Sequence, residues 1–218
     1  MAALEKVGAN ICAMQLIANV DSALSEALNL PQSMKSLGIF TADSDDVAYI
    51  AADEATKHAD VEVVYGRSMY AGANNSPSFT SGEVVVMFAG KGPSDVRTAL
   101  TRVVAAVGHE VSFQWADERR NVAFLAHVVT SCGSYLSSVA GVCKGESIAY
   151  LIAPALEATV GLDAALKASD VRLLSYIEPP SPTNYGGAYL HGSQSACKAA
   201  ANAFSDAVIR ISKNPVSL

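Results

Sequence analysis

One stretch of the sequence occurs twice, and this repeat limits the possible folds more than any other feature. Residues 48–61 read AYIAADEATKHADV, and residues 158–171, a constant 110 positions further along, read ATVGLDAALKASDV. The residues shared by the two copies are Ala48 and Ala158, Asp53 and Asp163, Ala55 and Ala165, Lys57 and Lys167, Asp60 and Asp170, and Val61 and Val171. Because this spacing is close to half of the 218 residues, the sequence predicts two similar domains, 1–109 and 110–218, rather than a solenoid.

The composition favours a chain that buries part of its surface against another molecule. Apolar residues make up 50% of the chain and charged residues only 17%, whereas a freely soluble domain carries about a quarter charged residues. Two domains of roughly 100 residues can each bury a substantial core. The remaining apolar excess predicts self-association.

The charge and the cysteines exclude several classes of partner. The net charge is −6 and no cluster of Lys and Arg with interleaved aromatic residues occurs, so we expect no nucleic-acid ligand. A cationic or neutral small molecule suits this charge better. The four cysteines form no CxxC pair and no disulfide framework, which is typical of a reducing cytosol. The apolar run 11–20 is too short to span a bilayer and lacks a signal-peptide pattern, so we expect no membrane insertion or secretion.

Hydrophobic periodicity predicts the same order of elements in both halves: strand, short helix, strand, helix, strand, strand, helix. The expected strands are 11–20, 37–42, 60–65 and 83–88 in the first half, and 122–130, 148–153, 170–176 and 188–191 in the second. The expected helices are 21–30, one starting at Ser44 or Asp45, and 94–107, then 131–142, one starting at Pro154, and 193–211. Helix 131–142 contains Gly133 and Gly141 and is expected to be weaker than its counterpart. This order is that of a ferredoxin-like α+β domain with its last strand moved to the front, a circular permutation.

The connections between the paired strands of each half differ from the rest of the chain. The first, 66–82, has 17 residues rich in Gly, Ser, Asn and Pro, and structureless loops beyond roughly 12–15 residues tend to be functional or disordered. The second, 178–187, carries three prolines and two adjacent glycines. Their bulky residues are Met69, Tyr70 and Phe79 in the first and Tyr185 in the second. Disordered linkers are poor in aromatic residues, so these side chains either form a lid or plug or fix the loops to the domain body.

Several segments of the chain resemble a known family. AADEATKHADVEVVY and DAALKASDVRLLSY resemble the helix-to-strand junction of bacterial microcompartment shell proteins. TADSDDVAYIAADEATKHADVEVVYGRS, QWADERRNVAFLAHVV and GSQSACKAAANAFSDAV are similar to the tandem-domain shell proteins of ethanolamine-utilisation microcompartments. The resemblance extends over nearly the full length of the chain.

This resemblance implies a fold, an assembly and a location. It implies two circularly permuted microcompartment shell domains per chain and a homotrimer that imitates a hexamer. These trimers would tile with other shell proteins into the shell of a cytoplasmic microcompartment. Lys57 and Lys167 match the lysine that lies on the edge between neighbouring tiles, and the long loops would open and close a central pore.

The resemblance also implies a narrow acidic passage in each subunit that binds ethanolamine. Ethanolamine carries a primary amine and, like lysine, is cationic at neutral pH, so partly shielded carboxylates attract it. The residues that match the passage are Asp45 in ADSDD and Glu83 at the start of a strand, with Phe113 or Trp115 in SFQWADE as the neighbouring wall. Without the resemblance, the pattern favours a simple helix cap at Asp45.

No catalytic, cofactor or metal motif accompanies these features. GKGPS at 90–94 lacks the spacing of a P-loop, and GSQS at 192–195 is not a nucleophile elbow. The four histidines lie far apart and show no metal-ligand spacing. We therefore expect a non-enzymatic shell protein without a metal or cofactor. Two alternatives remain: a ferredoxin-like ligand-binding regulator, and an enzyme with its active site between the two halves.

Overall fold

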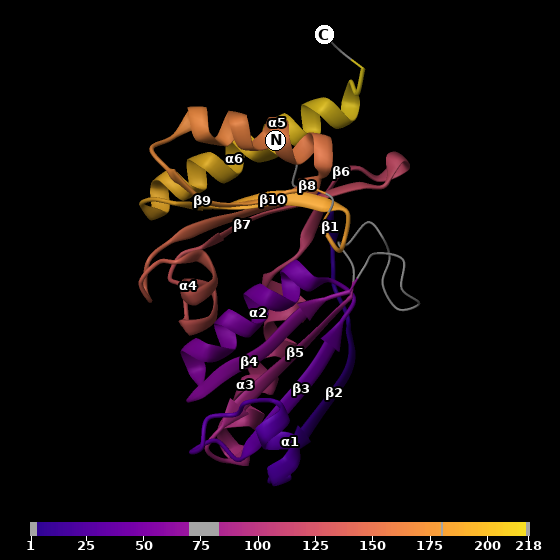
Figure 1. Ribbon diagram of the computed structural model, residues 1–218. Coiled ribbons are helices and arrows are strands. Elements are labelled where there is room, and N and C mark those ends of the chain that lie inside the picture. The colour runs from indigo at the N-terminus through magenta and orange to yellow at the C-terminus, as the bar shows by residue number, and fades with distance from the viewer. Residues whose placement is uncertain (1–3, 70–82, 180, 217–218) are drawn as a thin grey trace.

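The structure, a computed structural model, describes residues 4–69, 83–179 and 181–216 (Figure 1). Two modules follow each other along the chain, each with the order of elements expected from the sequence. The first contains β2 (Ile11–Ile17), α1 (Ser22–Ala27), β3 (Ser36–Ala42), α2 (Asp45–His58), β4 (Val61–Ser68), β5 (Val84–Gly90) and α3 (Pro93–Ala105). The second contains β7 (Val122–Val129), α4 (Ser134–Ala140), β8 (Ile148–Pro154), α5 (Ala155–Ala168), β9 (Arg172–Ile177), β10 (Tyr185–His191) and α6 (Gln194–Lys213).

The two modules share one sheet topology. The strands of the first are ordered β2-β3-β5-β4 and their counterparts in the second β7-β8-β10-β9, with antiparallel neighbours throughout. The central strand pairs place Ile39 opposite Met87 in the first sheet and Tyr150 opposite Tyr189 in the second. The predicted fold class, α+β with two tandem circularly permuted ferredoxin-like modules, is confirmed.

Two further strands extend only the second sheet. β6 (Phe113–Asp117) pairs with β7, and β1 (Lys6–Val7) pairs with β6, which gives the order β1-β6-β7-β8-β10-β9. A segment near the N-terminus therefore joins the sheet of the second module. The predicted division between residues 109 and 110 falls in the π-helical turn Ala106–Glu110 that continues α3. We propose that the modules divide at this turn, with β1 belonging to the second sheet.

The expected bounds of helix 131–142 and of strand 188–191 are wrong. α4 spans Ser134–Ala140 and is therefore shorter at both ends than expected. Gly133 is its N-cap residue and Gly141 ends it in the left-handed region at φ 69°, so both glycines flank the helix, where the second serves as the C-cap. β10 begins at Tyr185, earlier than the expected Ala188. Tyr185 is therefore a strand residue.

The modules share a core and are not joined by a linker. α5 and α6 cover one face of the second sheet, while α2 of the first module lies beneath the other face, next to α4 (Figure 1). α2 and α3 pack against the first sheet. Val47 and Ile50 of α2 belong to the same buried hydrophobic cluster as Leu136 of α4 and Tyr150 of β8. Helix α2 thus contributes to the cores of both modules.

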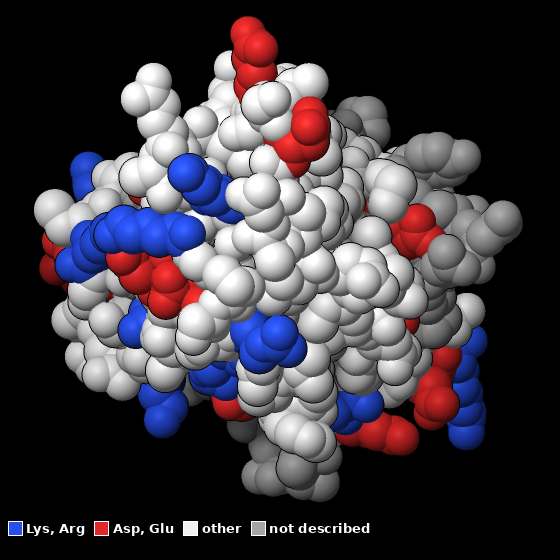
Figure 2. All heavy atoms as spheres, turned by 90° about the horizontal axis from the view of Figure 1, so that it is seen from below, with Lys and Arg blue, Asp and Glu red and all other residues white. Residues whose placement is uncertain are grey.

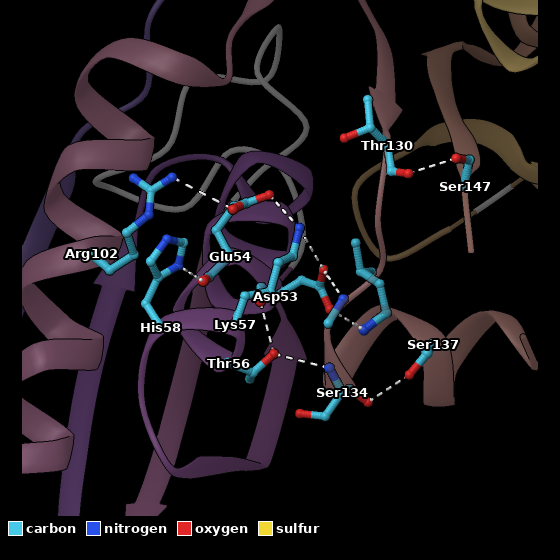
Figure 3. A network of polar contacts seen from close by, with 12 residues as sticks. Asp53, Glu54, Thr56, Lys57, His58, Arg102, Thr130, Ser134, Ser137 and Ser147 are labelled. Carbon is cyan, nitrogen blue, oxygen red and sulfur yellow. Dashed lines mark hydrogen bonds and ion pairs between the residues drawn. The ribbon is translucent and has the colours of Figure 1, made fainter. Parts of the chain in front are cut away.

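A buried carboxylate joins α2 to the start of α4 (Figure 3). Asp53 is fully buried; its Oδ2 accepts a hydrogen bond from the N–H of Gly133 at 2.7 Å and its Oδ1 from the N–H of Leu136 at 2.8 Å. Beside it, Thr56 Oγ1 accepts the N–H of Ser134 at 3.0 Å. The N-cap residue of α4, Gly133, has no side chain that could cap the helix. The first module therefore supplies the N-terminal cap of a helix in the second, and we call this contact the Asp53 cap.

Replacing Gly133 by alanine is expected to destabilise the chain. The added Cβ would lie 2.6 Å from the carbonyl oxygen of Asp53 and 2.8 Å from its Oδ1, so the Asp53 cap would have to shift. We expect a loss of about 2 kcal/mol in the free energy of unfolding, measured by urea denaturation. Gly108→Ala is the control, since a Cβ added there would lie in open space among the described residues. Equal stability of the two variants would contradict a close approach at Gly133.

Candidate ligand-binding site

A cavity of about 270 Å³ lies where the two modules meet. The start of α2 and the end of β4 bound it from the first module. The sheet of the second module, α4 and the connection after β9 bound it from the other side. We call it the acidic pocket and define it by Asp45, Asp46, Tyr49, Tyr150, Tyr185 and Tyr189.

The charge of the pocket comes from two carboxylates at the start of α2. Asp45 and Asp46 are its first two residues and are only 4% and 5% exposed. Asp45 Oδ1 accepts the N–H of Asp46 at 2.8 Å, and the hydroxyl of Tyr150 donates to Asp46 Oδ1. Ser44 is the N-cap residue, and Asp45 follows it as the first helical residue. Both acids therefore lie in the first turn of α2, where the positive end of the helix dipole attracts negative charge.

Four tyrosines form the walls of the pocket. Burial raises the pKa of Tyr49, Tyr185 and Tyr189 above the usual value of 10. Burial, followed by the charge of Asp46, also raises the pKa of Tyr150, so the hydroxyls stay neutral. The rings of Tyr150 and Tyr189 are 4.5 Å apart. Carboxylates beside aromatic faces favour a cationic ligand over an anionic or neutral one.

Glu83 belongs to a second acidic group. Glu83 and Asp43 both lie near Cys12, since their charges add to burial in raising the pKa of its thiol. Asp43 accepts hydrogen bonds from the backbone N–H and the side chain of Asn10, at 2.6 and 2.8 Å. Glu83 is 9% exposed and directly precedes β5. The structure brings Asp45, but not Glu83, into the described lining of the pocket.

The two aromatic candidates on β6 take different positions. Phe113 is fully buried, and its ring meets the ring of Tyr185 edge-on with the centroids 6.0 Å apart. Trp115 is half-buried against the shared hydrophobic cluster, and its backbone N–H donates to the carbonyl of Glu5 at 3.0 Å. Phe113 therefore supports the pocket wall from behind, while neither ring is part of the described lining.

The sequence pattern does not identify part of the lining. It places Asp46 only in the first turn of a helix and gives no role to Tyr150 or Tyr189. The available signal is the pair of adjacent acids at a helix start, together with tyrosines spaced for one face of a strand, as Tyr185 and Tyr189 are in β10. That signal indicates a polar site but not which module completes it.

The predicted loop residues are only partly described. Met69 directly follows β4 and is 37% exposed. Tyr185 is 6% exposed at the start of β10 and belongs to the pocket wall. Tyr70 and Phe79 lie outside the described residues.

The two lysines of the repeat have different surroundings. The side chain of Lys57 is 20% exposed, and its Nζ lies 2.5 Å from Glu54 Oε1 and 3.5 Å from Asp53 Oδ2 (Figure 3). The side chain of Lys167 is 74% exposed and pairs with Asp163 at 2.7 Å. Lys167 therefore reaches the surface of the single chain far more than Lys57 does.

The described surface offers little for other ligand classes. Seen from below, charges of both signs are mixed and uncharged residues fill the middle of the face, without a broad gathering of Lys and Arg (Figure 2). Within residues 4–69, 83–179 and 181–216, no group of three His, Cys, Asp or Glu side chains could hold a metal ion. None of the helices in the described part of the chain has the length and apolar character needed to cross a membrane.

Comparisons with known proteins agree with this fold. The family model of the BMC domain matches residues 36–115. The bacterial microcompartment shell protein EutL of Salmonella typhimurium is 56% identical over 216 residues, 99% of both chains. The crystal structure of the ethanolamine utilization protein EutL from Leptotrichia buccalis has a TM-score of 0.94 at 48% identity, covering 99% of both chains. The trimeric shell protein PduB has a TM-score of 0.77 at 18% identity over 94% of this chain and 89% of that one, which shows the fold alone.

The chain belongs to the bacterial microcompartment shell proteins and, within that class, to the EutL family. These relatives are named as components of a microcompartment shell, so the role of the chain is structural and not enzymatic. The two alternatives left by the sequence, an enzyme and a free ligand-binding regulator, are set aside by this membership.

Removing the hydroxyl of Tyr150 is expected to destabilise the chain, because the buried carboxylate of Asp46 would lose a donor. We expect Tyr150→Phe to lower the free energy of unfolding by about 1–3 kcal/mol, measured by chemical denaturation. Tyr65→Phe is the control, since Tyr65 is 37% exposed on β4. A Tyr150→Phe protein as stable as this control would show that Asp46 does not need the hydroxyl.

Proposed function

We propose that three copies of this chain form a ring of six modules, a homotrimeric tile in the shell of an ethanolamine-utilisation microcompartment. Each copy would carry one ethanolamine-binding site, the acidic pocket. The observation that carries the ring is an apolar surface that is exposed on the second module, while its equivalent on the first is buried or partly buried within the chain.

The exposed surface lies on α5 and β9. Its members are Leu156, Val160, Leu173 and Tyr176, which are 57%, 40%, 44% and 45% exposed, and we call it the α5–β9 patch. The corresponding positions, 110 residues earlier, are Asp46, Ile50, Val63 and Gly66. The second module covers them: Ile50 is fully buried, and a Cβ added to Gly66 would lie 2.9 Å from the hydroxyl of Tyr135. The patch therefore lacks a cover that its counterpart has.

The first module presents a surface that fits this patch. The face that β8 and β10 turn towards α2 is buried, whereas Ile39 and Met87, on the same face of the first sheet, are only partly buried. Leu24 on α1 is 41% exposed, while its counterpart on α4, Leu136, is fully buried. A second copy that placed its α5–β9 patch here would repeat the contact made within the chain. Such a head-to-tail contact closes into a ring when its rotation allows.

A ring of six modules needs three copies, and the related PduB is described as trimeric. The low content of charged residues, 17%, also suits a chain that buries several surfaces. We propose that such tiles meet one another and other shell proteins at edges that include Lys167 and Lys57. Lys167 is the stronger candidate because its side chain is exposed.

Ethanolamine suits the acidic pocket. Its amine is cationic at neutral pH, and Asp45 and Asp46 supply two shielded carboxylates beside tyrosine rings. A relative of 48% identity is named an ethanolamine utilization protein. We propose that Asp45 contacts the amine and that Glu83, with Phe113 or Trp115, belongs to the remainder of the same passage.

We further propose that ligand binding is coupled to a gated central pore. Ser181, Pro182 and Thr183, from the connection after β9, line the acidic pocket, so a bound ligand would contact this connection directly. Of the pore residues predicted on the other loop, Met69 is described, and Tyr70 and Phe79 lie outside the described residues. Ethanolamine would shift the equilibrium between the open and closed pore only by binding one of these two arrangements more tightly than the other.

Ethanolamine titrations of charge-removing variants test the site. We expect Asp45→Asn to weaken binding by about 1.5–3 kcal/mol in calorimetry, because one charged partner of the amine is lost. Glu83→Gln should weaken it less, since Glu83 is outside the pocket lining. Glu62→Gln, an exposed acid on β4, is the control. Unchanged affinity in both Asp45→Asn and Glu83→Gln would remove the passage from the proposal.

The α5–β9 patch is tested by placing a charge in it. Val160→Asp is expected to turn the assembly into monomers in sedimentation velocity, because an unpaired carboxylate would be buried between copies. Val104→Asp is the matched control, since Val104 is 51% exposed on α3, outside the patch. An assembly of unchanged size in Val160→Asp would contradict the head-to-tail contact.

A further inference from the structure

We infer that the contact between two copies in such a ring differs from the contact between the two modules of one chain, and is the weaker, because it has no counterpart of the Asp53 cap. This inference rests on the proposed ring. It assigns the between-copy contact to the start of α1 in one copy and to Asp163 and Leu166 on α5 of the next.

Helix α5 keeps the carboxylate of the cap but changes its surroundings. Asp163, the counterpart of Asp53, pairs with Lys167 at 2.7 Å, and its side chain is 62% exposed in the single chain, where no second copy covers it. Leu166 takes the place of Thr56, whose hydroxyl accepts a backbone N–H of α4. A leucine side chain accepts no hydrogen bond, so one of the two accepting side chains of the cap is missing from α5.

Helix α1 is already capped from within its own module. Asp21 is its N-cap residue, and Asp21 Oδ1 accepts the N–H of Ala23 at 2.9 Å. The equivalent residue of α4 is Gly133, where a Cβ would lie 2.6 Å from the carbonyl of Asp53. Asp21 does have a Cβ, so α1 cannot approach Asp163 as closely as α4 approaches Asp53.

The charges at this contact weaken it, as the added Cβ of Asp21 does. If a second copy repeats the contact made within the chain, Asp163 faces Asp21. Within the chain, a carboxylate meets the backbone N–H of a glycine, whereas between copies it would meet a second carboxylate. Lys167 pairs with Asp163 as Lys57 pairs with Asp53, so this ion pair does not distinguish the two contacts. The α5–β9 patch then supplies most of the attraction between copies. Each chain is thus a rigid pair of modules, and the ring separates between chains.

The inference is tested by giving the between-copy contact the residues of the within-chain contact. Asp21→Gly combined with Leu166→Thr provides the bare helix start and the hydroxyl of the Asp53 cap. In sedimentation velocity over a dilution series of the full chain, we expect half-dissociation at a protein concentration at least about tenfold below that of the natural chain. Adding Asp163→Asn to this pair should reverse the gain. In the natural chain, Asp163→Asn alone should not weaken association.

Two further measurements distinguish a change in association from a loss of folding. Thermal unfolding checks that the variants fold, and Asp21→Asn removes the charge while retaining a residue that caps helices well, so it should tighten association even if Asp21→Gly loosens α1. Weaker association in Asp163→Asn alone would overturn the inference, since a cap would then already exist between copies. The inference would also be overturned if neither the Asp21→Gly, Leu166→Thr double variant nor Asp21→Asn tightened the association between copies. A natural chain that stays monomeric at every concentration would instead remove the ring.

Discussion

The arrangement of the two modules depends on the buried carboxylate of Asp53. An isolated charge in this position would be very costly, and its two hydrogen bonds to the start of α4 compensate for that cost. The same bonds fix the second module against α2. Because α2 is covered on both sides, residues such as Ala51, Ala52 and Ala55 are fully buried, and their small side chains allow close packing. A chain of two separately folded domains would have no need for such a helix.

The acidic pocket is a consequence of this packing. The start of α2 brings two acids, and the sheet of the second module brings three of the tyrosines, so neither module alone holds the site. A ligand in the pocket would contact both modules and the connection before β10 at once. Binding there would be coupled to the packing between the modules, which is the physical basis for proposing that the ligand influences the pore.

The sequence predicts the elements well and their partners poorly. Each helix and strand carries its own periodicity, so the order of elements in both halves could be read directly, and the repeat of Asp53 and Asp163 revealed the two modules. The pairing of β1 with β6 could not be read, because Lys6 and Gln114 are far apart and a two-residue strand has no pattern. Gly133 shows the same limit. Local propensity counts it as a weakness in a helix, whereas the fold uses its missing side chain for a close approach to Asp53.

The family resemblance identified one residue of the candidate site but not the residues around it. Asp45 lies in the acidic pocket, but its neighbours come from strands that are more than 100 residues distant in sequence, such as β8 and β10. Chemistry that depends on such contacts leaves no local pattern. The two lysines of the repeat are indistinguishable in sequence, yet the fold shields one and exposes the other.

Hydrogen exchange at the backbone amides of Gly133 and Leu136 tests the central claim most directly. If Asp53 holds the two modules as one unit, these amides should exchange as slowly as those in the centre of β8, and Asp53→Asn should release them. The amide of Leu24, at the equivalent position of α1, should exchange faster. Exchange of Leu136 as fast as that of Leu24 would mean that the modules separate readily, and would contradict the account.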